Sequence, residues 1–374
     1  MRILKVCASR AWGGMEMSMA LTAAKLRERG HAVFPVCQPD SPIEENLRGA
    51  GFDPVICDIW GKFHPDKVWQ LARLVRREAI DLIHTDNSRD LFSLVPVRQL
   101  SGRLPLVLQK HIGTGDPKNL VVHHYLYRRV DFVIAISEVI RANLLATHPL
   151  RPDQVGVVHA GIDLGRFHGD PVARARIRTE LGVPDSACLV GIIGRLQKEK
   201  GHFDFIEVAQ RLAPDNPETR FVMVGAPTPG WEEEAAEIRQ AARDAGLGER
   251  LILAGFRTDV PALLDAMDLF LFPSHAEAYG LVVVEAMAMG LPVVAYGCDG
   301  VLDLVVSGQT GELVDLYDRD ALTAVTAGLL ADGERRRAMG RAGRQRVEER
   351  FTEEHMYRQL ESLYDGLVAR HRAG

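Results

Sequence analysis

The stretch LFLFPSHAEAYGLVVVEAMAMGLPVVAY, residues 269–296, is a single segment whose pattern indicates the fold class. It opens with a short apolar run, 269–273, passes through a polar loop into an apolar segment of helical length, and closes with PVVAY, 292–296. Two short apolar runs joined in this way predict parallel strands connected by a crossover helix. Strands of that kind are buried on both faces, which fits their lack of polar residues.

The same alternation continues in both directions along the chain. Further apolar runs lie at residues 3–7, 31–37, 53–57, 81–85, 105–110, 131–137, 155–159, 188–194, 220–225, 250–255 and 311–315. The alternation predicts an α/β protein with parallel sheets covered by helices on both faces. Because the pattern pauses and then restarts near residues 165–172, we expect one domain over 1–166 and a second over 167–350. Residues 351–374 are expected to form a closing helix.

Composition narrows the class of protein. The chain has 374 residues, of which 47% are hydrophobic and 25% are charged, which is ordinary for a globular protein and excludes disordered and collagen-like classes. No apolar stretch approaches the roughly 20 residues that span a bilayer, and the first residues lack the apolar core of a signal peptide. The five cysteines are scattered without a CxxC pair, so we expect reduced thiols and a cytoplasmic location.

Charge is shared unevenly. The net charge is −5, but the first domain is mildly basic and the remainder acidic. A basic half could bind an anionic partner or the cytoplasmic face of an anionic inner membrane, or it could be ordinary solvated surface. The predicted helix 67–77 has an apolar face and several arginines, so it could lie on a membrane, although packing on its own sheet is the favoured interpretation. No nucleic-acid partner is expected.

Two carboxylates frame the start of the helix within 275–296. Glu285 is the only charge in an apolar helix, where a carboxylate needs a hydrogen-bond partner such as the vicinal hydroxyls of a ribose. Glu277 precedes the helix in a loop and could reach a polar ligand. The amides of Gly280 and Leu281 at the helix start favour a phosphate. The alternative is an internal salt bridge for Glu285 and a solvated Glu277.

Two cations follow the strand at 188–194. Arg195 and Lys200 stand in the loop IIGRLQKEKG, 192–201, which leads to a helix. Arginine offers a planar fork to phosphate oxygens and lysine a mobile point charge, so the two could hold a diphosphate without a metal ion. The alternative is that these residues form an ordinary solvent-exposed loop without a ligand, and for Lys198 that interpretation is preferred.

Two weaker candidates lie in the first domain. Glycines in ASRAWGGMEMS, 8–18, would let the backbone approach a ligand, but the stretch is not the GxGxxG dinucleotide fingerprint. His111 ends a strand before a glycine-rich loop, and a lone histidine is more often structural than functional.

Familiar metal-binding, phosphate-binding and nucleophile motifs are missing from the sequence. It contains no HExxH, Walker A, GxSxG or paired-cysteine pattern. The DRD at 318–320 has the letters of a metal-binding DxD, but it opens a predicted helix and is interpreted as its cap. We therefore expect no metal site and no cofactor.

Taken together, these pieces resemble the retaining GT-B glycosyltransferases of glycosyltransferase family 4. The resemblance covers nearly the whole chain and rests mainly on the Glu-x7-Glu pair within 254–295, supported by GGME (13–16), HAGIDLGRF (159–167) and GRLQKEKG (194–201). It implies two Rossmann-like domains facing across a cleft, with the C-terminal helix packing back on the N-terminal domain.

The resemblance also implies roles for individual residues. The implied donor contacts are Arg195 and Lys200 on the diphosphate, Glu285 on the ribose, Glu277 on the transferred sugar, the amides of Gly280 and Leu281, Phe256 and Arg257 beside the nucleobase, and Gly14 near the diphosphate. His111 is implied to orient the sugar near the reacting carbon. Of this set, His111, Glu277, Arg195 and Lys200 are implied to be catalytic.

This chain departs from the family pattern at three places. Ala160-Gly161 stands where Asn-Gly is usual, and the loop VGAPTPG, 224–230, is also atypical. The third is CDGVLD, 298–303, which replaces a loop that commonly carries a Gly-Gly pair followed by Glu. Since that loop helps to shape the sugar pocket, the identity of the sugar stays open.

The reaction expected from the resemblance is metal-independent transfer of a hexose from a UDP- or GDP-sugar, with retention, to a hydroxyl of a cell-envelope glycan or glycolipid. Inversion would require a general base in the first domain, for which Asp86 and Asp116 are candidates. Three functions compete with sugar transfer: that of a sugar-nucleotide epimerase or hydrolase, that of a noncatalytic nucleotide-sugar binding protein, and that of a dehydrogenase.

Overall fold

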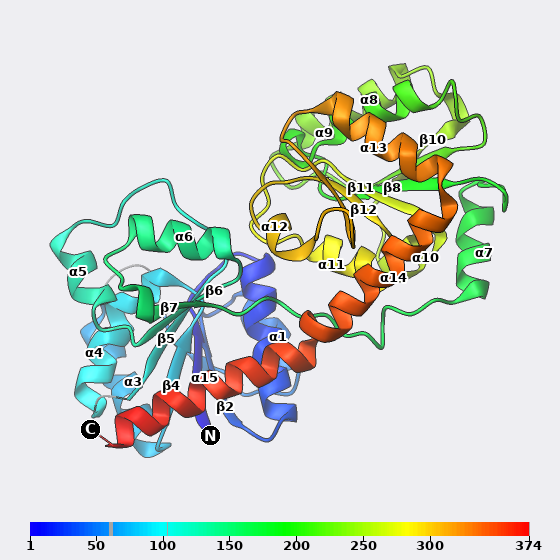
Figure 1. The fold of residues 1–374 in the computed structure, drawn as a ribbon. Helices are drawn as coiled ribbons and strands as arrows, with labels where there is room; N and C mark the ends of the chain where they lie inside the picture. The colour runs from blue at the N-terminus through cyan, green and yellow to red at the C-terminus, as the bar shows by residue number, and fades with distance from the viewer. Residues whose placement is uncertain (60–62, 103, 374) are drawn as a thin grey trace. The chain divides into compact units, whose positions relative to one another are not determined.

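Strand β1 (Arg2–Cys7) lies inside a parallel sheet whose order, within the described residues, is β3-β2-β1-β4-β5-β6-β7 (Figure 1). The computed structural model describes residues 1–59, 63–102 and 104–373, so Gly374 of the predicted closing segment lies outside the described residues. The chain divides into two units, Met1–His159 with Met356–Gly374 as the first and Ala160–His355 as the second.

The first unit alternates strands with helices along the chain. Its further strands are β2 (Ala32–Cys37), β3 (Val55–Ile56), β4 (Leu82–Thr85), β5 (Leu106–Lys110), β6 (Phe132–Ala135) and β7 (Val155–Val157). Its helices are α1 (Gly14–Glu28), α2 (Pro42–Gly49), α3 (Pro65–Arg77), α4 (Leu91–Ser101), α5 (Val121–Tyr127) and α6 (Glu138–Thr147). All the strand pairs recorded in this sheet are parallel, because each connection carries the chain back across a helix.

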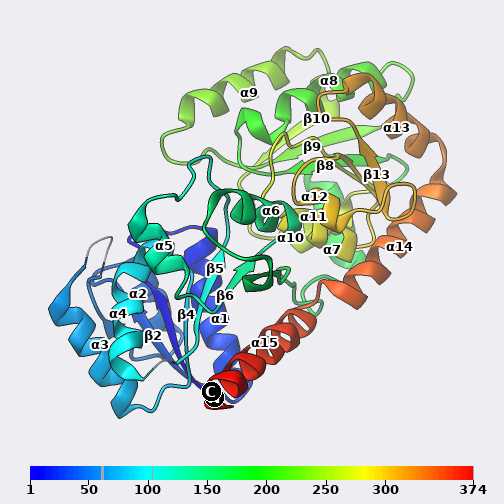
Figure 2. The same ribbon diagram turned by 60° about the vertical axis from the view of Figure 1, so that its left-hand side comes forward.

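The C-terminal helix α15 (Glu353–Ala373) completes the first unit. Figures 1 and 2 both show it lying along the sheet of that unit. It buries an apolar stripe at helical spacing, made of Tyr357, Leu360, Tyr364, Leu367 and Val368, in one cluster with Ile3, Leu82, Val107 and Ile134 of the strands. Glu361 of α15 forms an ion pair with Arg29, which follows α1, at 2.9 Å. The arginine lowers the pKa of the Glu361 carboxyl to about 2.

The second unit is built on a parallel sheet of order β10-β9-β8-β11-β12-β13 among the described residues. Its strands are β8 (Leu189–Ile193), β9 (Arg220–Val224), β10 (Leu251–Gly255), β11 (Leu269–Phe272), β12 (Val293–Tyr296) and β13 (Gly311–Val314). Its helices are α7 (Pro171–Glu180), α8 (His202–Leu212), α9 (Glu232–Asp244), α10 (Val260–Ala266), α11 (Leu281–Ala288), α12 (Val301–Leu304), α13 (Arg319–Ala331) and α14 (Gly333–Arg350). Residues 269–296 are thus β11, α11 and β12, the parallel pair and crossover helix that the sequence predicts.

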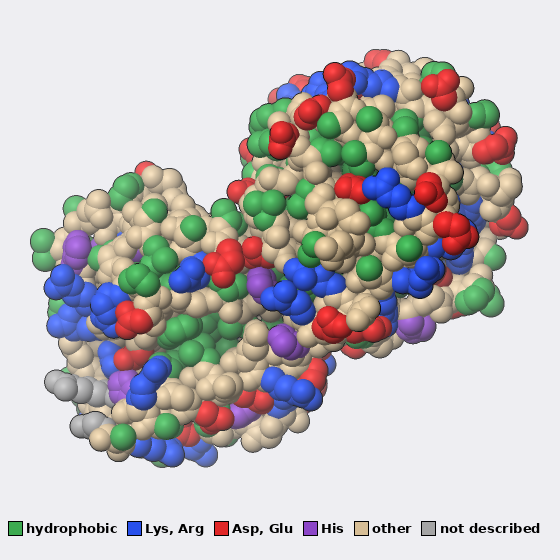
Figure 3. Space-filling view, viewed as in Figure 1, with side chains coloured by type: hydrophobic (Ala, Val, Ile, Leu, Met, Phe, Trp, Pro, Cys, Tyr) green, Lys and Arg blue, Asp and Glu red, His purple; other side chains and the backbone are tan. Residues whose placement is uncertain are grey.

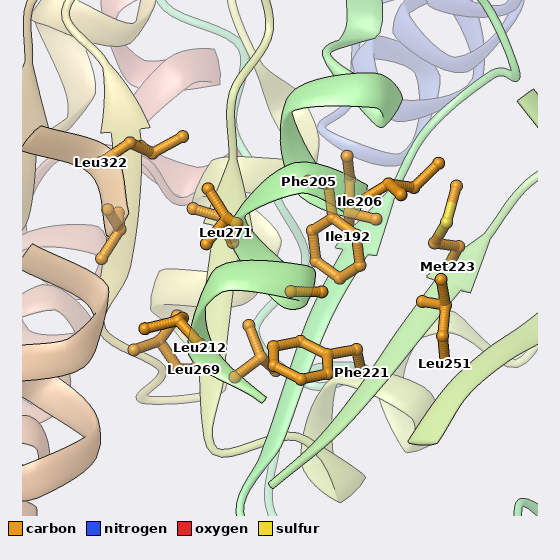
Figure 4. Close-up of a cluster of buried hydrophobic side chains, with 14 of the residues drawn as sticks. Ile192, Phe205, Ile206, Leu212, Phe221, Met223, Leu251, Leu269, Leu271 and Leu322 are labelled. Atoms are coloured by element: carbon orange, nitrogen blue, oxygen red, sulfur yellow. The ribbon is translucent and has the colours of Figure 1, made fainter. Parts of the chain in front are cut away.

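The core of the second unit fills the space between its sheet and the helices α8, α9 and α13. In Figure 4 the rings of Phe205 from α8 and Phe221 from β9 lie among leucine and isoleucine side chains of the strands. These two rings meet edge to face, with centroids 6.2 Å apart. Aromatic pairs in this geometry add to the stability that comes from burial alone.

Several local predictions can be compared with the structure. The α/β class with parallel sheets is confirmed, as is the return of the C-terminal helix to the first unit. Asp318 of the DRD sequence accepts a 2.8 Å hydrogen bond from the Ala321 amide and so caps α13 as predicted. The apolar face of α3 is buried against its own unit, which decides against the membrane interpretation of residues 67–77; it consists of Val68, Leu71, Leu74 and Val75.

The surface of the first unit carries a shallow groove beside β7. It measures about 500 Å³, and its lining includes Phe132 of β6, Val157 of β7, Val158 just after β7, and both apolar and polar side chains of α15. Figure 3 shows hydrophobic side chains at the surface there, while basic and acidic side chains are interspersed over the rest of the visible face. Within the described residues, none of the helices is both long enough and apolar enough to span a membrane.

Candidate active site

The order of the strands decides where a ligand site is expected. In each sheet the direction of chain progression reverses, between β1 and β4 in the first unit and between β8 and β11 in the second. Parallel sheets bind ligands beyond the carboxyl ends of the strands at such a reversal, where two loops diverge. The loops after β8 and β11 hold Arg195, Lys200 and Glu277. The loop after β1 leads to Gly14 at the start of α1, and the loop after β4 holds Asp86.

Lys200 and Glu277 meet across the two loops of the second unit. Lys200 Nζ lies 2.8 Å from Glu277 Oε2 and 3.4 Å from the carbonyl oxygen of Ala276. The exposed fractions of the two side chains are 15% and 19%, so the pair is sheltered but open to a ligand. An anion that entered here would find an ammonium group whose present partner is a carboxylate.

Gly201 explains why these loops can approach so closely. Its φ of +75° lies in the left-handed region, and a Cβ at this position would stand 1.8 Å from the carbonyl oxygen of Pro273. No residue with a side chain fits that contact without moving the backbone. The adjoining hydrogen bond from the His275 amide to the Glu199 carbonyl, at 2.8 Å, ties the same two loops together.

Arg195 occupies the first position after the strand-end glycine of β8. Its carbonyl oxygen is 2.8 Å from His202 Nε2, a contact that anchors its backbone to the start of α8. Its side chain is exposed and forms no ion pair with any residue that the structure describes. The guanidinium is therefore available to a ligand, whereas Lys198 pairs at 2.7 Å with Glu237 on the surface.

Glu285 lies in α11 and is mostly buried. Burial raises the pKa of its carboxyl to about 7, and Arg166 acts in the opposite direction. Among the described residues it has no ion-pair partner, so the internal salt bridge considered from the sequence does not form. A carboxylate in such a place is stabilised when hydrogen-bond donors of a ligand reach it.

The start of α11 is shaped by two glycines. Gly280 precedes the helix with φ +95°, and Leu281, the first helical residue, is 44% exposed. A Cβ at Gly300 would lie 2.6 Å from the carbonyl oxygen of Ala278, so the segment 298–303 packs closely against the loop that precedes α11. The carboxylate of Asp299 accepts a 3.1 Å hydrogen bond from the Glu277 amide. Asp299 is thus a supporting residue that the sequence alone did not single out.

Phe256 and Arg257 follow β10 and differ in their surroundings. Phe256 is 74% exposed, as a residue that stacks on a planar ligand can be. The Arg257 guanidinium lies 2.7 Å from Asp259 and also pairs with Glu180, and these two carboxylates raise the pKa of the arginine above its ordinary value. Arg257 is therefore engaged with its own unit, and nothing in its contacts points to a ligand.

Gly14 begins α1 in the first unit, after Gly13 at the N-cap. A Cβ at Gly14 would meet no atom within 4 Å, so packing within this unit does not require glycine there. The preceding loop is fixed by the Ala8 amide, which donates a 3.2 Å hydrogen bond to Asp90.

His111 follows β5, and its Nε2 lies 3.3 Å from Asp86 Oδ1. The side chain of Asp86 is fully buried, with Lys5 Nζ 2.5 Å from Oδ2. Burial by itself would raise the pKa of Asp86, but Lys5 and His111 outweigh it and hold that pKa below its ordinary value. A carboxylate kept ionised by a buried lysine is poorly suited to act as a general base, while Asp116 stands exposed on a loop.

The structure groups Lys200, Glu277 and Arg195 at one sheet edge of the second unit, whereas His111 and Gly14 belong to the first unit. Over residues 1–59, 63–102 and 104–373, the structure shows no group of three His, Cys, Asp or Glu side chains that could hold a metal ion.

Two family models match the chain in succession. Residues 12–166 match the model described as Glycosyltransferase Family 4, and residues 173–346 match the one described as Glycosyl transferases group 1. The D-inositol 3-phosphate glycosyltransferase of Segniliparus rotundus is 32% identical over 310 residues, which are 81% of this chain and 64% of that protein. The chain thus spans under two thirds of the length of that relative.

Two further similarities concern a bacterial relative and a solved structure. The lipopolysaccharide core biosynthesis mannosyltransferase LpsB of Rhizobium meliloti is 31% identical over 246 residues, covering 65% of this chain and 68% of that protein. The crystal structure of Anabaena HepE in complex with UDP superposes with a TM-score of 0.83 at 23% identity, covering 98% of this chain and 100% of the other. That superposition shows the GT-B fold. With its two matching family models and these relatives, the chain belongs to glycosyltransferase family 4.

Proposed function

We propose that this protein transfers a hexose from a nucleoside diphosphate sugar to a hydroxyl group of an acceptor, with retention of configuration and without a metal ion. The observation that carries the proposal is Glu285, a mostly buried carboxylate without an ion-pair partner among the described residues. The two vicinal hydroxyls of a ribose supply the two donors that such a group lacks. Membership of glycosyltransferase family 4 supports the same conclusion.

The diphosphate would be bound by Arg195, Lys200 and the amides at the start of α11. These groups supply positive potential where negative charge develops as the sugar–phosphate bond breaks, and each well-placed donor contributes a few kcal/mol. Lys200 would exchange its contact with Glu277 for phosphate oxygens, which its sheltered but open position allows. This set of groups makes a metal ion unnecessary for leaving-group stabilisation.

The sugar would be handled by Glu277 and His111. Freed from Lys200, Glu277 would accept hydrogen bonds from sugar hydroxyls, while its amide stays held by Asp299. His111 of the first unit would orient the sugar at the reacting carbon, and Gly14 would let the backbone approach the diphosphate. The acceptor hydroxyl would attack from the face that the phosphate leaves, and a departing phosphate oxygen would take its proton.

The donor and acceptor classes are suggested by similar proteins. The HepE structure holds UDP, which favours a UDP-sugar, whereas GDP-sugars stay the second class to be tested. LpsB is named for lipopolysaccharide core biosynthesis, which favours a glycan or glycolipid of the cell envelope as acceptor. Phe256 is the side chain best exposed to stack on the base.

The experiment is a calorimetric screen of UDP-, GDP-, ADP- and dTDP-sugars, followed by turnover with an acceptor panel and NMR of the anomeric proton in the product. We expect one nucleotide class to bind, product of retained configuration, and turnover that survives EDTA. Consumption of donor without acceptor would instead identify a hydrolase or epimerase. Binding without any turnover would identify a noncatalytic binding protein, and NAD binding a dehydrogenase.

A further inference from the structure

We propose that Asp86 is a positioning residue that fixes which ring nitrogen of His111 carries the proton, and that Lys5 holds Asp86 in place for this purpose. The inference deepens the role proposed above for His111 and rests on it. It is carried by a chain of contacts that lies entirely within the first unit.

The geometry at Asp86 divides its two oxygens between two partners. The side chains of Lys5 and Asp86 are both fully buried, and Lys5 Nζ lies 2.5 Å from Oδ2. The other oxygen, Oδ1, lies 3.3 Å from Nε2 of His111. Because the lysine holds one side of the carboxylate, the carboxylate presents its other oxygen to the histidine in a fixed direction.

Lys5 has a second contact, with a buried histidine. Its Nζ lies 3.2 Å from Nε2 of His84, a fully buried histidine on the neighbouring strand β4. An ammonium group only donates, so His84 accepts at Nε2 and carries its own proton on Nδ1, which contacts the Tyr364 hydroxyl of α15. Burial and the nearby Lys5 lower the pKa of His84, which keeps this ring neutral.

The proton arrangement at His111 follows from the same rule. An ionised carboxylate accepts hydrogen bonds and cannot donate, so the His111 nitrogen that faces Asp86 must carry hydrogen. In the neutral ring the proton is then on Nε2, and Nδ1 keeps a lone pair. Nδ1 can then accept a hydrogen bond from a substrate hydroxyl, and 16% of the His111 side chain is exposed.

A purely structural role for the pair predicts something different. A buried ion pair that only stabilises the fold would affect unfolding and leave both the tautomer of His111 and the turnover of folded protein unchanged. The tautomer is therefore the decisive measurement, and it does not depend on whether a donor sugar has been identified.

The first experiment is nitrogen NMR of the full chain labelled with ¹⁵N-histidine, with the His111 signals assigned by comparison with His111→Gln. In the neutral His111 ring of the wild type we expect Nε2 to carry the proton and Nδ1 to be unprotonated. In Asp86→Asn the amide can rotate to donate, so the tautomer population should change. A wild-type proton on Nδ1, or an unchanged tautomer in folded Asp86→Asn, overturns the proposal.

Removing one charge of a buried pair can prevent folding, so a second variant is needed. Lys5→Met combined with Asp86→Asn replaces both charges by neutral groups of similar size, which avoids an unpaired buried charge. We expect this double variant to fold and to show the same change of tautomer as Asp86→Asn. A folded double variant with the wild-type tautomer would count against the assignment.

Kinetics separate this inference from the proposed function. In folded Asp86→Asn, kcat should fall about tenfold or more, the loss expected for a charged hydrogen bond, with little change in the KM for donor. Asp153→Asn, at an exposed carboxylate paired with Arg151, is the matched control and should retain wild-type kcat. A wild type that transfers no sugar overturns the proposed function, and NMR still decides the tautomer. Wild-type kcat in Asp86→Asn overturns the positioning role.

Discussion

Each unit of this protein has a lysine–carboxylate pair whose carboxylate follows a strand of its sheet, and the two pairs differ in burial. Lys5 and Asp86 in the first unit are completely buried at 2.5 Å. Lys200 and Glu277 in the second unit are separated by 2.8 Å and retain 15% and 19% exposure. A buried pair cannot exchange partners without unfolding its surroundings, whereas a sheltered open pair can release its lysine to an incoming anion. Burial thus separates a pair that positions its neighbours from a pair that can bind.

The largest effect expected from this difference in burial is the loss of stability when the buried Lys5–Asp86 pair is broken. Lys5→Met leaves Asp86 buried without its cation, and we expect the free energy of unfolding to fall by about 3–5 kcal/mol. Lys198→Met removes the exposed Lys198–Glu237 pair and should lower the free energy of unfolding far less than Lys5→Met does, because water screens that pair. Urea unfolding followed by circular dichroism measures both. Equal losses in the two variants would remove the distinction drawn from burial.

The second effect concerns the unpaired carboxylate of the open site. The folded-state pKa of Glu285, about 7, lies above its ordinary 4.5, so the folded protein binds more protons than the unfolded chain between these values. Stability is therefore retained below pH 4.5 and declines as the pH rises towards 7, by up to about 3 kcal/mol. Glu285→Gln should abolish this decline.

The measurement for Glu285 is a series of unfolding curves from pH 4.5 to 8. Glu218→Gln, at an exposed carboxylate of the same unit, is the control and should follow the wild type. Glu285→Gln should also weaken binding of the nucleoside diphosphate, with less effect on the 2′-deoxyribose analogue. Parallel pH curves for wild type and Glu285→Gln would show that this carboxylate is not in a desolvated site.

A third effect concerns binding by the open pair. Lys200→Ala and Arg195→Ala should each weaken UDP or GDP binding about 10- to 100-fold, because each removes a charged hydrogen bond worth about 1.5–3 kcal/mol. The free energy of unfolding should change little, in contrast to Lys5→Met. Calorimetry with Lys198→Ala as control measures the affinity. Unchanged affinity in both variants would exclude these side chains from the diphosphate site.

The smallest effect has the opposite sign. Glu277→Gln removes the carboxylate that competes for Lys200, so the free nucleoside diphosphate should bind equally well or a few-fold more tightly. Turnover should fall, because the same carboxylate is proposed to hold the sugar. Calorimetry and initial rates on one preparation test both points. Weaker nucleotide binding in Glu277→Gln would contradict the idea that Lys200 exchanges partners.

The regular parts of the fold could be predicted because each depends on neighbouring residues. The run 269–296 showed a strand, a helix and a strand by its own pattern, and these are β11, α11 and β12. The candidate residues after β8 and β11 could also be named, because parallel strands end at a common edge.

The contacts among charged residues could not be predicted in the same way. Lys5 was not among the candidate residues named from the sequence. Its partner Asp86 lies on a loop that the sheet order, not the sequence order, brings beside β1. Likewise the ion pairs of Arg257 with Glu180 and Asp259 could not be inferred from its position after β10, and its place beside the nucleobase stays a prediction. A pattern along the chain does not show which distant side chain neutralises a charge.

Helix α15 has a consequence for synthesis on the ribosome. The first unit closes its apolar surface only with residues 356–374, which emerge after all of 160–355. At about 5–20 residues per second, that wait lasts roughly 10 to 40 seconds. During this interval the apolar surface that α15 will cover stays exposed on the nascent first unit, while the second unit has time to fold. We expect a chaperone to be most useful during this interval.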